Sequence, residues 1–154
     1  LARAAEIGGA FNIAVSDSTG GLLAFARMDG AFALSGGIAQ DKAWTVAGFN
    51  GIPTDEFYEA ISNEDAVREG IAQRGRVAAF GGGVPVLVDG ALVGAVGASG
   101  GPAVHPGGQR QSGQPAQQQH QPRPSGGSAG QDKQVARAGA HAVAAALTHG
   151  EDTP

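Results

Sequence analysis

The sequence predicts an α+β fold in which antiparallel β-hairpins alternate with helices. Residues 11–28 and 84–98 each contain two short apolar runs around a glycine-containing turn, which is the pattern of a β-hairpin. A helical pattern follows each hairpin, in the second case after a long polar segment. Hydrophobic residues make up 42% of the 154 residues, enough for the core of one domain, but aromatic residues make up only 5%. We therefore expect a core built mainly from alanine and branched aliphatic side chains.

The first 50 residues predict one hairpin and two helices. Residues 1–7 have the pattern of a helix that stops at Gly8 and Gly9. After the hairpin, residues 35–50 predict a helix with one apolar face and one polar face. The apolar face holds Ala39, Ala43, Val46 and Ala47, and the polar face holds Asp41, Lys42 and Thr45.

Two short helices and a strand should follow. Residues 54–62 predict a helix with Thr54 as its cap, and residues 63–74 predict another. Residues 76–80 have the composition of a strand, and three glycines break it before the second hairpin, whose tight turn is Asp89-Gly90. In the last helix, after Ser128, the residues expected to face inward are Val135, Ala138, Gly139, Ala142, Val143 and Ala146.

A low-complexity insertion separates the second hairpin from the last helix. Residues 102–124 hold seven glutamines and five prolines, and their only apolar side chains besides proline are Ala103, Val104 and Ala116. Such a segment buries too little surface to offset the entropy lost on ordering. We therefore interpret residues 1–154 as a single domain interrupted at about 102–127.

A short phrase occurs twice, as SGGIAQDK at residues 35–42 and SGGSAGQDK at residues 125–133. Each copy opens a helix, and Asp132 in the first turn suits the helix dipole. The phrase therefore has a local interpretation as the start of a helix. The alternative is that the two Asp-Lys pairs, Asp41-Lys42 and Asp132-Lys133, share a pocket or a subunit contact.

Composition excludes several classes of function. The net charge is −4 and lysines and arginines are not clustered, which argues against a nucleic-acid surface. No apolar run reaches the length of a membrane span, and the absence of cysteine excludes thiolate chemistry. No two histidines have a metal-binding spacing, so no protein-bound metal site is expected. We expect a cytoplasmic location, and because the chain starts inside a helix without methionine, a secreted form stays open.

Three segments resemble one known family. They are MDGAFALSGGIAQDKAWTVAGF (28–49), FGGGVPVLVDGALVGAVGASGG (80–101) and SAGQDKQVARAG (128–139). They are similar to the haem-degrading or GlcG-type family, which includes HbpS-type haem-binding proteins and the C-terminal domain of PduO. This resemblance implies a profilin-like antiparallel sheet of about five strands with helices on both faces. It also implies homo-oligomers, with the octamer as one form, and haem as a ligand.

The candidate ligand site is centred on the glycine-rich loop. Exposed backbone N–H groups of consecutive glycines can hold a carboxylate or phosphate, and Lys42 would add a cation. The predicted ligand-binding residues are Arg27, Lys42, Thr45, Phe80, Gly81, Gly82, Gly83 and Pro85. If haem binds, its iron ligand could be His105 or His120 of the insertion, or Thr45 or Lys42.

Two function classes stay open from the sequence, beside a third possibility in which the chain is a structural oligomer and its glycine loops are only subunit contacts. The first is a haem-binding (tetrapyrrole-binding) protein that assists haem degradation or sensing, with a corrinoid as a variant ligand. The second is a small enzyme or accessory protein acting on an organic-acid metabolite, with Lys42 and Asp41 as its polar groups. Whether the chain is an enzyme is therefore not decided at this level.

Overall fold

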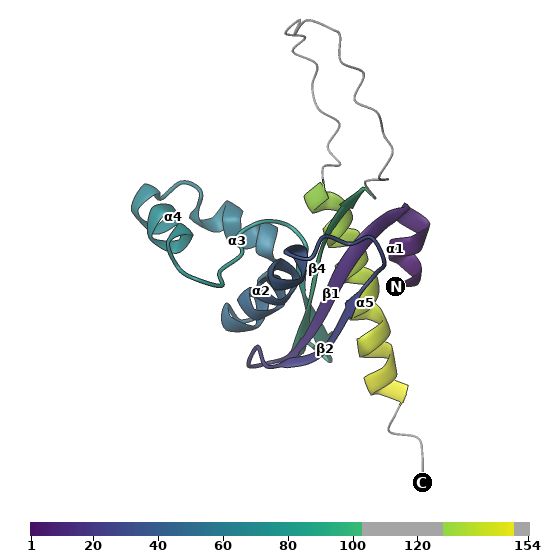
Figure 1. Ribbon diagram of the computed structural model, residues 1–154. Helices are drawn as coiled ribbons and strands as arrows, with labels where there is room; N and C mark the ends of the chain where they lie inside the picture. The colour runs from purple at the N-terminus through teal and green to yellow at the C-terminus, as the bar shows by residue number, and fades with distance from the viewer. Residues whose placement is uncertain (103–127, 150–154) are drawn as a thin grey trace, which may run out of the picture.

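The computed structural model describes residues 1–102 and 128–149 (Figure 1). Its elements follow in the order α1 (Ala2–Ile7), β1 (Gly9–Asp17), β2 (Leu22–Arg27), α2 (Ser35–Gly48), α3 (Thr54–Ile61), α4 (Asp65–Ala72), β3 (Gly83–Val88), β4 (Ala91–Pro102) and α5 (Ser128–His149). The two predicted hairpins are β1–β2 and β3–β4. Asp89 and Gly90 both have positive φ, of 50° and 79°, as a two-residue hairpin turn requires. Pro102, predicted to belong to the insertion, is instead the last residue of β4.

The strands form one antiparallel sheet in the order β2-β1-β4-β3. The hairpins join through β1 and β4, which pair from Gly9 opposite Pro102 to Asp17 opposite Gly94. The predicted α+β class and antiparallel sheet are therefore confirmed, with four strands in the described residues where about five were expected.

Helices cover both faces of this sheet, as Figure 1 shows. α1 and α5 pack on one face, in a core cluster that includes Phe11, Val84, Val96 and Val135. α2 packs on the other face, in a cluster of Ala14, Ala39, Ala43, Val46, Ala47 and Ala95. The expectation of an aliphatic core rich in alanine is confirmed.

Small side chains let α2 lie directly against β4. A Cβ atom at Gly97 would be 1.9 Å from the carbonyl oxygen of Ala39, so only glycine fits at this position. This contact explains how a sheet with few aromatic residues still packs tightly. It also brings the next turn of α2, which carries Lys42, against the centre of the sheet.

α3 and α4 extend to the side of α2, away from β2 (Figure 1). Phe57 is buried and its ring lies 4.2 Å from that of Phe49, so α3 is anchored at the end of α2. α4 buries no residue. In the described part of the chain, no helix is both long and apolar enough to cross a membrane.

The prediction of a strand at residues 76–80 was wrong. Arg76 adopts a positive φ of 68°, and the N–H of Ala78 donates to the hydroxyl of Thr45 at 2.9 Å instead of to a strand. The segment is irregular and crosses the end of α2. The apolar composition of residues 76–80 could not show that a side chain, and not a neighbouring strand, accepts the hydrogen bond from this segment.

Two expectations about helices also need correction. Thr54 does not cap α3; its hydroxyl accepts a hydrogen bond from the N–H of Gly83 at 2.9 Å. In α5 the buried apolar residues are Val135, Ala136 and Ala140, while Ala138, Ala142 and Ala146 are exposed. The helix is rotated from the expected orientation because Asp132, a charged residue, points inward.

Candidate functional site

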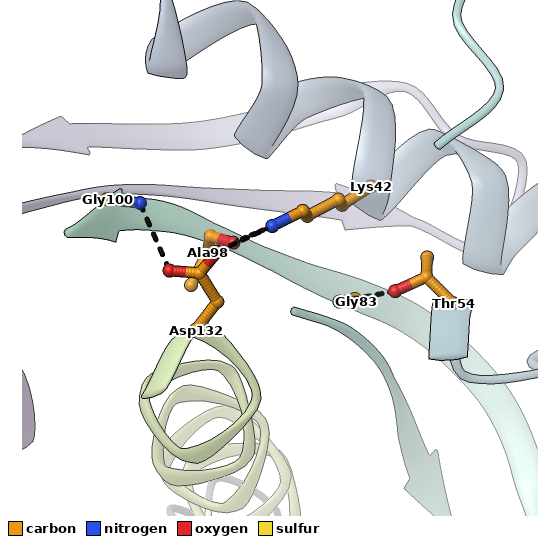
Figure 2. A network of polar contacts seen from close by, with 6 residues as sticks. All are labelled: Lys42, Thr54, Gly83, Ala98, Gly100 and Asp132. Carbon is orange, nitrogen blue, oxygen red and sulfur yellow. Dashed lines mark hydrogen bonds and ion pairs between the residues drawn. The ribbon is translucent and has the colours of Figure 1, made fainter. Parts of the chain in front are cut away.

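The two copies of the repeated phrase meet in the interior. Lys42 extends from α2 and Asp132 from α5, and the Lys42 Nζ lies 2.7 Å from an Asp132 oxygen (Figure 2). The side chains are 0% and 6% exposed, respectively. The idea of a shared environment for the two Asp-Lys pairs is therefore correct for one residue of each pair. The other two point elsewhere, with Asp41 paired to Arg76 and Lys133 to Asp55.

Each charged group in this pair has further partners. Lys42 also donates to the carbonyl oxygen of Ala98 at 2.9 Å and lies 4.8 Å from the centre of the Phe80 ring. The second oxygen of Asp132 accepts from the N–H of Gly100 at 3.1 Å, as Figure 2 shows. The network therefore ties α2, α5 and the end of β4 together.

Burial and mutual attraction shift the pKa values of the pair in opposite directions. Burial lowers the pKa of Lys42 and raises that of Asp132, because both charged forms lose their hydration. The mutual hydrogen bond and charge attraction oppose both pKa shifts. Lys42 thus has an internal counter-ion and no exposed surface.

The glycine loop packs against the same network. A Cβ atom at Gly82 would lie 2.6 Å from both the Ala98 oxygen and the Lys42 Nζ, and the φ of Gly82 is 123°. At Gly83 a Cβ would lie 2.6 Å from a methyl carbon of Thr54. The glycines therefore allow close approach of the backbone, and the Gly83 N–H is bonded to Thr54.

On the outer side of this network lies an apolar groove. One hollow of about 250 Å³ is lined by Tyr58, Ile61, Arg68, Ile71, Ala72, Val77, Ala79 and Phe80. An adjoining hollow of about 300 Å³ is lined by Asp55, Tyr58, Glu59, Ala79, Phe80 and Gly81. Because both share Tyr58, Ala79 and Phe80, we treat them as one site and call it the Phe80 groove. Phe80 is 48% exposed, with Lys42 near its ring.

The charges along the Phe80 groove are unequal. Arg68 lines the first hollow, where it donates to the Ser62 carbonyl at 2.8 Å and pairs with Asp65 at 2.8 Å. Asp55 and Glu59 line the second hollow. Burial raises the pKa of Asp55, but hydrogen bonds, led by that from Lys133, outweigh it and leave a lowered value. An anionic group of a ligand would therefore prefer the Arg68 end.

The structure brings six of the eight predicted site residues together. Phe80 and Gly81 line the groove, and Lys42, Thr45, Gly82 and Gly83 form the layer behind it. Arg27 lies elsewhere, on β2, and donates to the Ala31 carbonyl at 3.2 and 2.9 Å. Pro85 also lies outside the groove. Its Cβ is 3.6 Å from the position that a Cβ atom added to Gly51 would take.

Sequence reasoning missed Tyr58 and Arg68 as groove residues. A signal existed in their spacing, since Tyr58 and Ile61 lie three residues apart on α3, as do Arg68 and Ile71 on α4. His105 and His120, considered as iron ligands, lie outside the described residues. Within residues 1–102 and 128–149, no group of three or more His, Cys, Asp or Glu side chains could hold a metal ion.

Comparison with known proteins gives a consistent result. A family model described as "Haem degrading protein HbpS-like" matches residues 1–105. Protein GlcG of Escherichia coli is 40% identical over 88 residues, which cover 57% of this chain and 63% of GlcG, so less than two thirds of that relative is spanned.

Solved structures are similar over most of the chain. The PduOC:haem complex is 25% identical, with a TM-score of 0.68, and the match covers 92% of this chain and 83% of PduOC. A double mutant of Streptomyces reticuli HbpS is 27% identical, with a TM-score of 0.65 and coverage of 91% and 75%.

Proposed function

Because this chain belongs to the haem-degrading HbpS-like family, we propose that it binds haem, and that the Phe80 groove holds it. The observation that carries the proposal is the groove itself, an apolar cleft with two aromatic side chains and one cation at one end. Ligand sites are typically apolar clefts with a few polar groups that set orientation. The similar structure of PduOC is that of a haem complex, which supports the choice of ligand.

The groove residues fit the parts of haem. Phe80 and Tyr58 offer aromatic surface to a flat macrocycle, and Ile61, Ile71 and Val77 offer aliphatic surface. Arg68 suits a propionate group, whereas Asp55 and Glu59 would repel one. The propionates should therefore lie toward α4.

The buried network gives the groove a rigid floor. Lys42 donates hydrogen bonds to Asp132 and Ala98 and lies near the Phe80 ring. Its role in this proposal is to hold Phe80 in place. An enzyme that used Lys42 and Asp41 on an organic acid would need both side chains to be accessible. Lys42 has no exposed surface, so its burial counts against such an enzyme.

A hemin titration of the purified chain tests the proposal. We expect a shifted Soret band that saturates at about one hemin per chain, and no comparable saturation with cobalamin. Saturation by cobalamin instead would favour the corrinoid alternative. A hemin spectrum that never saturates would overturn the proposed function.

We also propose that the chain forms a homo-oligomer, with an octamer as one form. β2 pairs with β1 alone among the described strands and so leaves one edge open. This edge and the following loop expose the apolar side chains of Leu22, Leu23, Phe25, Phe32 and Leu34. An open apolar edge strand favours pairing with another chain. Light scattering that returned a monomer mass at micromolar concentration would contradict this proposal.

A further inference from the structure

Few side chains of this protein can ligate haem iron. The usual protein ligands to haem are the nitrogen of histidine, the sulfur of cysteine or methionine and the oxygen of tyrosine. Lys42 and Thr45, also considered from the sequence, are both buried and bonded to other parts of the protein. The chain has four histidines, one methionine, one tyrosine and no cysteine. Only six residues are therefore of a type that commonly ligates haem iron.

Among these types, Tyr58 is the only one in the described residues whose side chain lines the Phe80 groove. Met28 lies away from it, packed against the core cluster of α1 and α5. His141 is exposed on α5 and lines neither hollow of the groove. His149 is the last residue of α5, whose C-terminal end lies away from α3 and α4 (Figure 1). Chemistry and position together select one residue.

The fold holds Tyr58 at the junction of the two hollows. It lines both of them and is 47% exposed, so its phenol ring faces the groove and solvent. The preceding residue, Phe57, is buried against Phe49, and Thr54 is bonded to Gly83. These two anchors fix the rotation of α3, and with it the direction of Tyr58.

Charged side chains of both signs line the two hollows that Tyr58 borders, with Asp55 and Glu59 in one and Arg68 in the other. Arg68 lines the same hollow as Tyr58 and is held there by its bonds to Ser62 and Asp65. An anionic oxygen is a hard ligand and prefers ferric to ferrous iron.

We propose that the phenol oxygen of Tyr58 is the protein ligand to the haem iron, an inference that rests on the proposed binding of haem in the Phe80 groove. Tyr58 then selects ferric haem. The remaining groove residues hold the macrocycle and its propionates.

The test compares hemin binding by the wild type, by Tyr58→Phe and by a control, His141→Ala. The phenylalanine keeps the ring and removes only the oxygen. We expect the wild type and His141→Ala to show a phenolate-to-iron charge-transfer band and phenolate modes in resonance Raman spectra. Tyr58→Phe should lose both signals. Its hemin affinity should fall by at least the roughly tenfold typical of losing a group that supports a metal ligand.

The outcomes separate this inference from the proposed function. If the wild type shows no saturable hemin binding, haem binding fails and the inference fails with it. If the wild type binds and Tyr58→Phe keeps the same spectrum and affinity, only the assignment of Tyr58 is overturned. Loss of binding in His105→Ala or His120→Ala, with Tyr58→Phe unchanged, would overturn it in favour of the insertion. Circular dichroism of each variant confirms that the fold is intact.

Discussion

Lys42 and Asp132 are separated by 90 positions in the sequence and by 2.7 Å in the structure, and both side chains are buried. They come from the two copies of the repeated phrase, one at the start of α2 and the other at the start of α5. Their contact links the helices on opposite faces of the sheet. It also places a cation 4.8 Å from the centre of the aromatic ring that lines the groove.

Removing one member of this pair should destabilise the protein strongly. Lys42→Ala or Asp132→Ala leaves a buried charge without its partner, which typically costs about 3–5 kcal/mol. The double variant Lys42→Met/Asp132→Leu should recover most of this loss, because burial already opposes both charges. Chemical denaturation provides the free energies of unfolding.

A surface ion pair provides the control for these variants. Arg3 and Glu6 lie 2.9 Å apart with both side chains exposed, so Arg3→Ala should cost less than about 1 kcal/mol. Equal losses for Lys42→Ala and Arg3→Ala would show that the buried pair does not support the fold as described.

Two glycine substitutions should have opposite effects. Gly82→Ala places a Cβ 2.6 Å from the Ala98 oxygen at a positive φ, so we expect a marked loss of stability. Gly37→Ala lies in α2 with nothing within 4 Å of the new Cβ, and should stabilise the protein by up to about 1 kcal/mol. Thermal unfolding measures both, and a tolerated Gly82→Ala would contradict the close packing of the loop.

The pair of Asp55 and Lys133 should make stability depend on pH. The folded pKa of Asp55 lies below its ordinary value of 3.8, so its contribution is present above that value. The contribution is lost as the pH falls through the folded pKa. Asp55→Asn should therefore lower stability at neutral pH and flatten the acid limb of a stability–pH curve. If the curve of Asp55→Asn kept the wild-type slope in acid, this assignment would be wrong.

The insertion should be dispensable for folding. Asp132, at the start of α5, accepts a hydrogen bond from Gly100 near the end of β4, so the two ends that flank residues 103–127 are already held together. Deleting residues 103–127 should shift the thermal midpoint by only a few degrees, because loop length has a small effect on stability. Loss of soluble protein on deletion would refute the single-domain interpretation.

Local patterns predicted most of the fold but little of the site. The hairpins, α1 and α2 follow from periodicity and glycine positions that act over a few residues. The orientation of α5 did not follow, because a charged residue, Asp132, takes a buried position that only Lys42 from a distant segment can satisfy. The prediction of a strand at residues 76–80 was wrong for a similar reason, because the N–H of Ala78 donates to the Thr45 hydroxyl.

The Phe80 groove could not be predicted from local patterns, because residues from three separate segments line it. Phe80 was predicted as a site residue from its place beside the glycines, whereas Tyr58 and Arg68 lie in segments that were predicted only to be helices. Lys42 was expected to bind a ligand directly, and its burial instead gives it a place behind Phe80. Only the packing of α3 and α4 against residues 77–81 brings these groups to one surface.

Hemin affinity of a groove-filling variant tests the central claim most directly. Ala79 lines both hollows of the Phe80 groove, so Ala79→Trp should fill the space that the macrocycle needs. Ala142→Trp, at an exposed position on α5, adds the same side chain away from the groove. We predict that Ala79→Trp loses saturable hemin binding while Ala142→Trp binds as the wild type does, with both variants folded by circular dichroism. Wild-type affinity in Ala79→Trp would contradict the proposal that this groove holds haem.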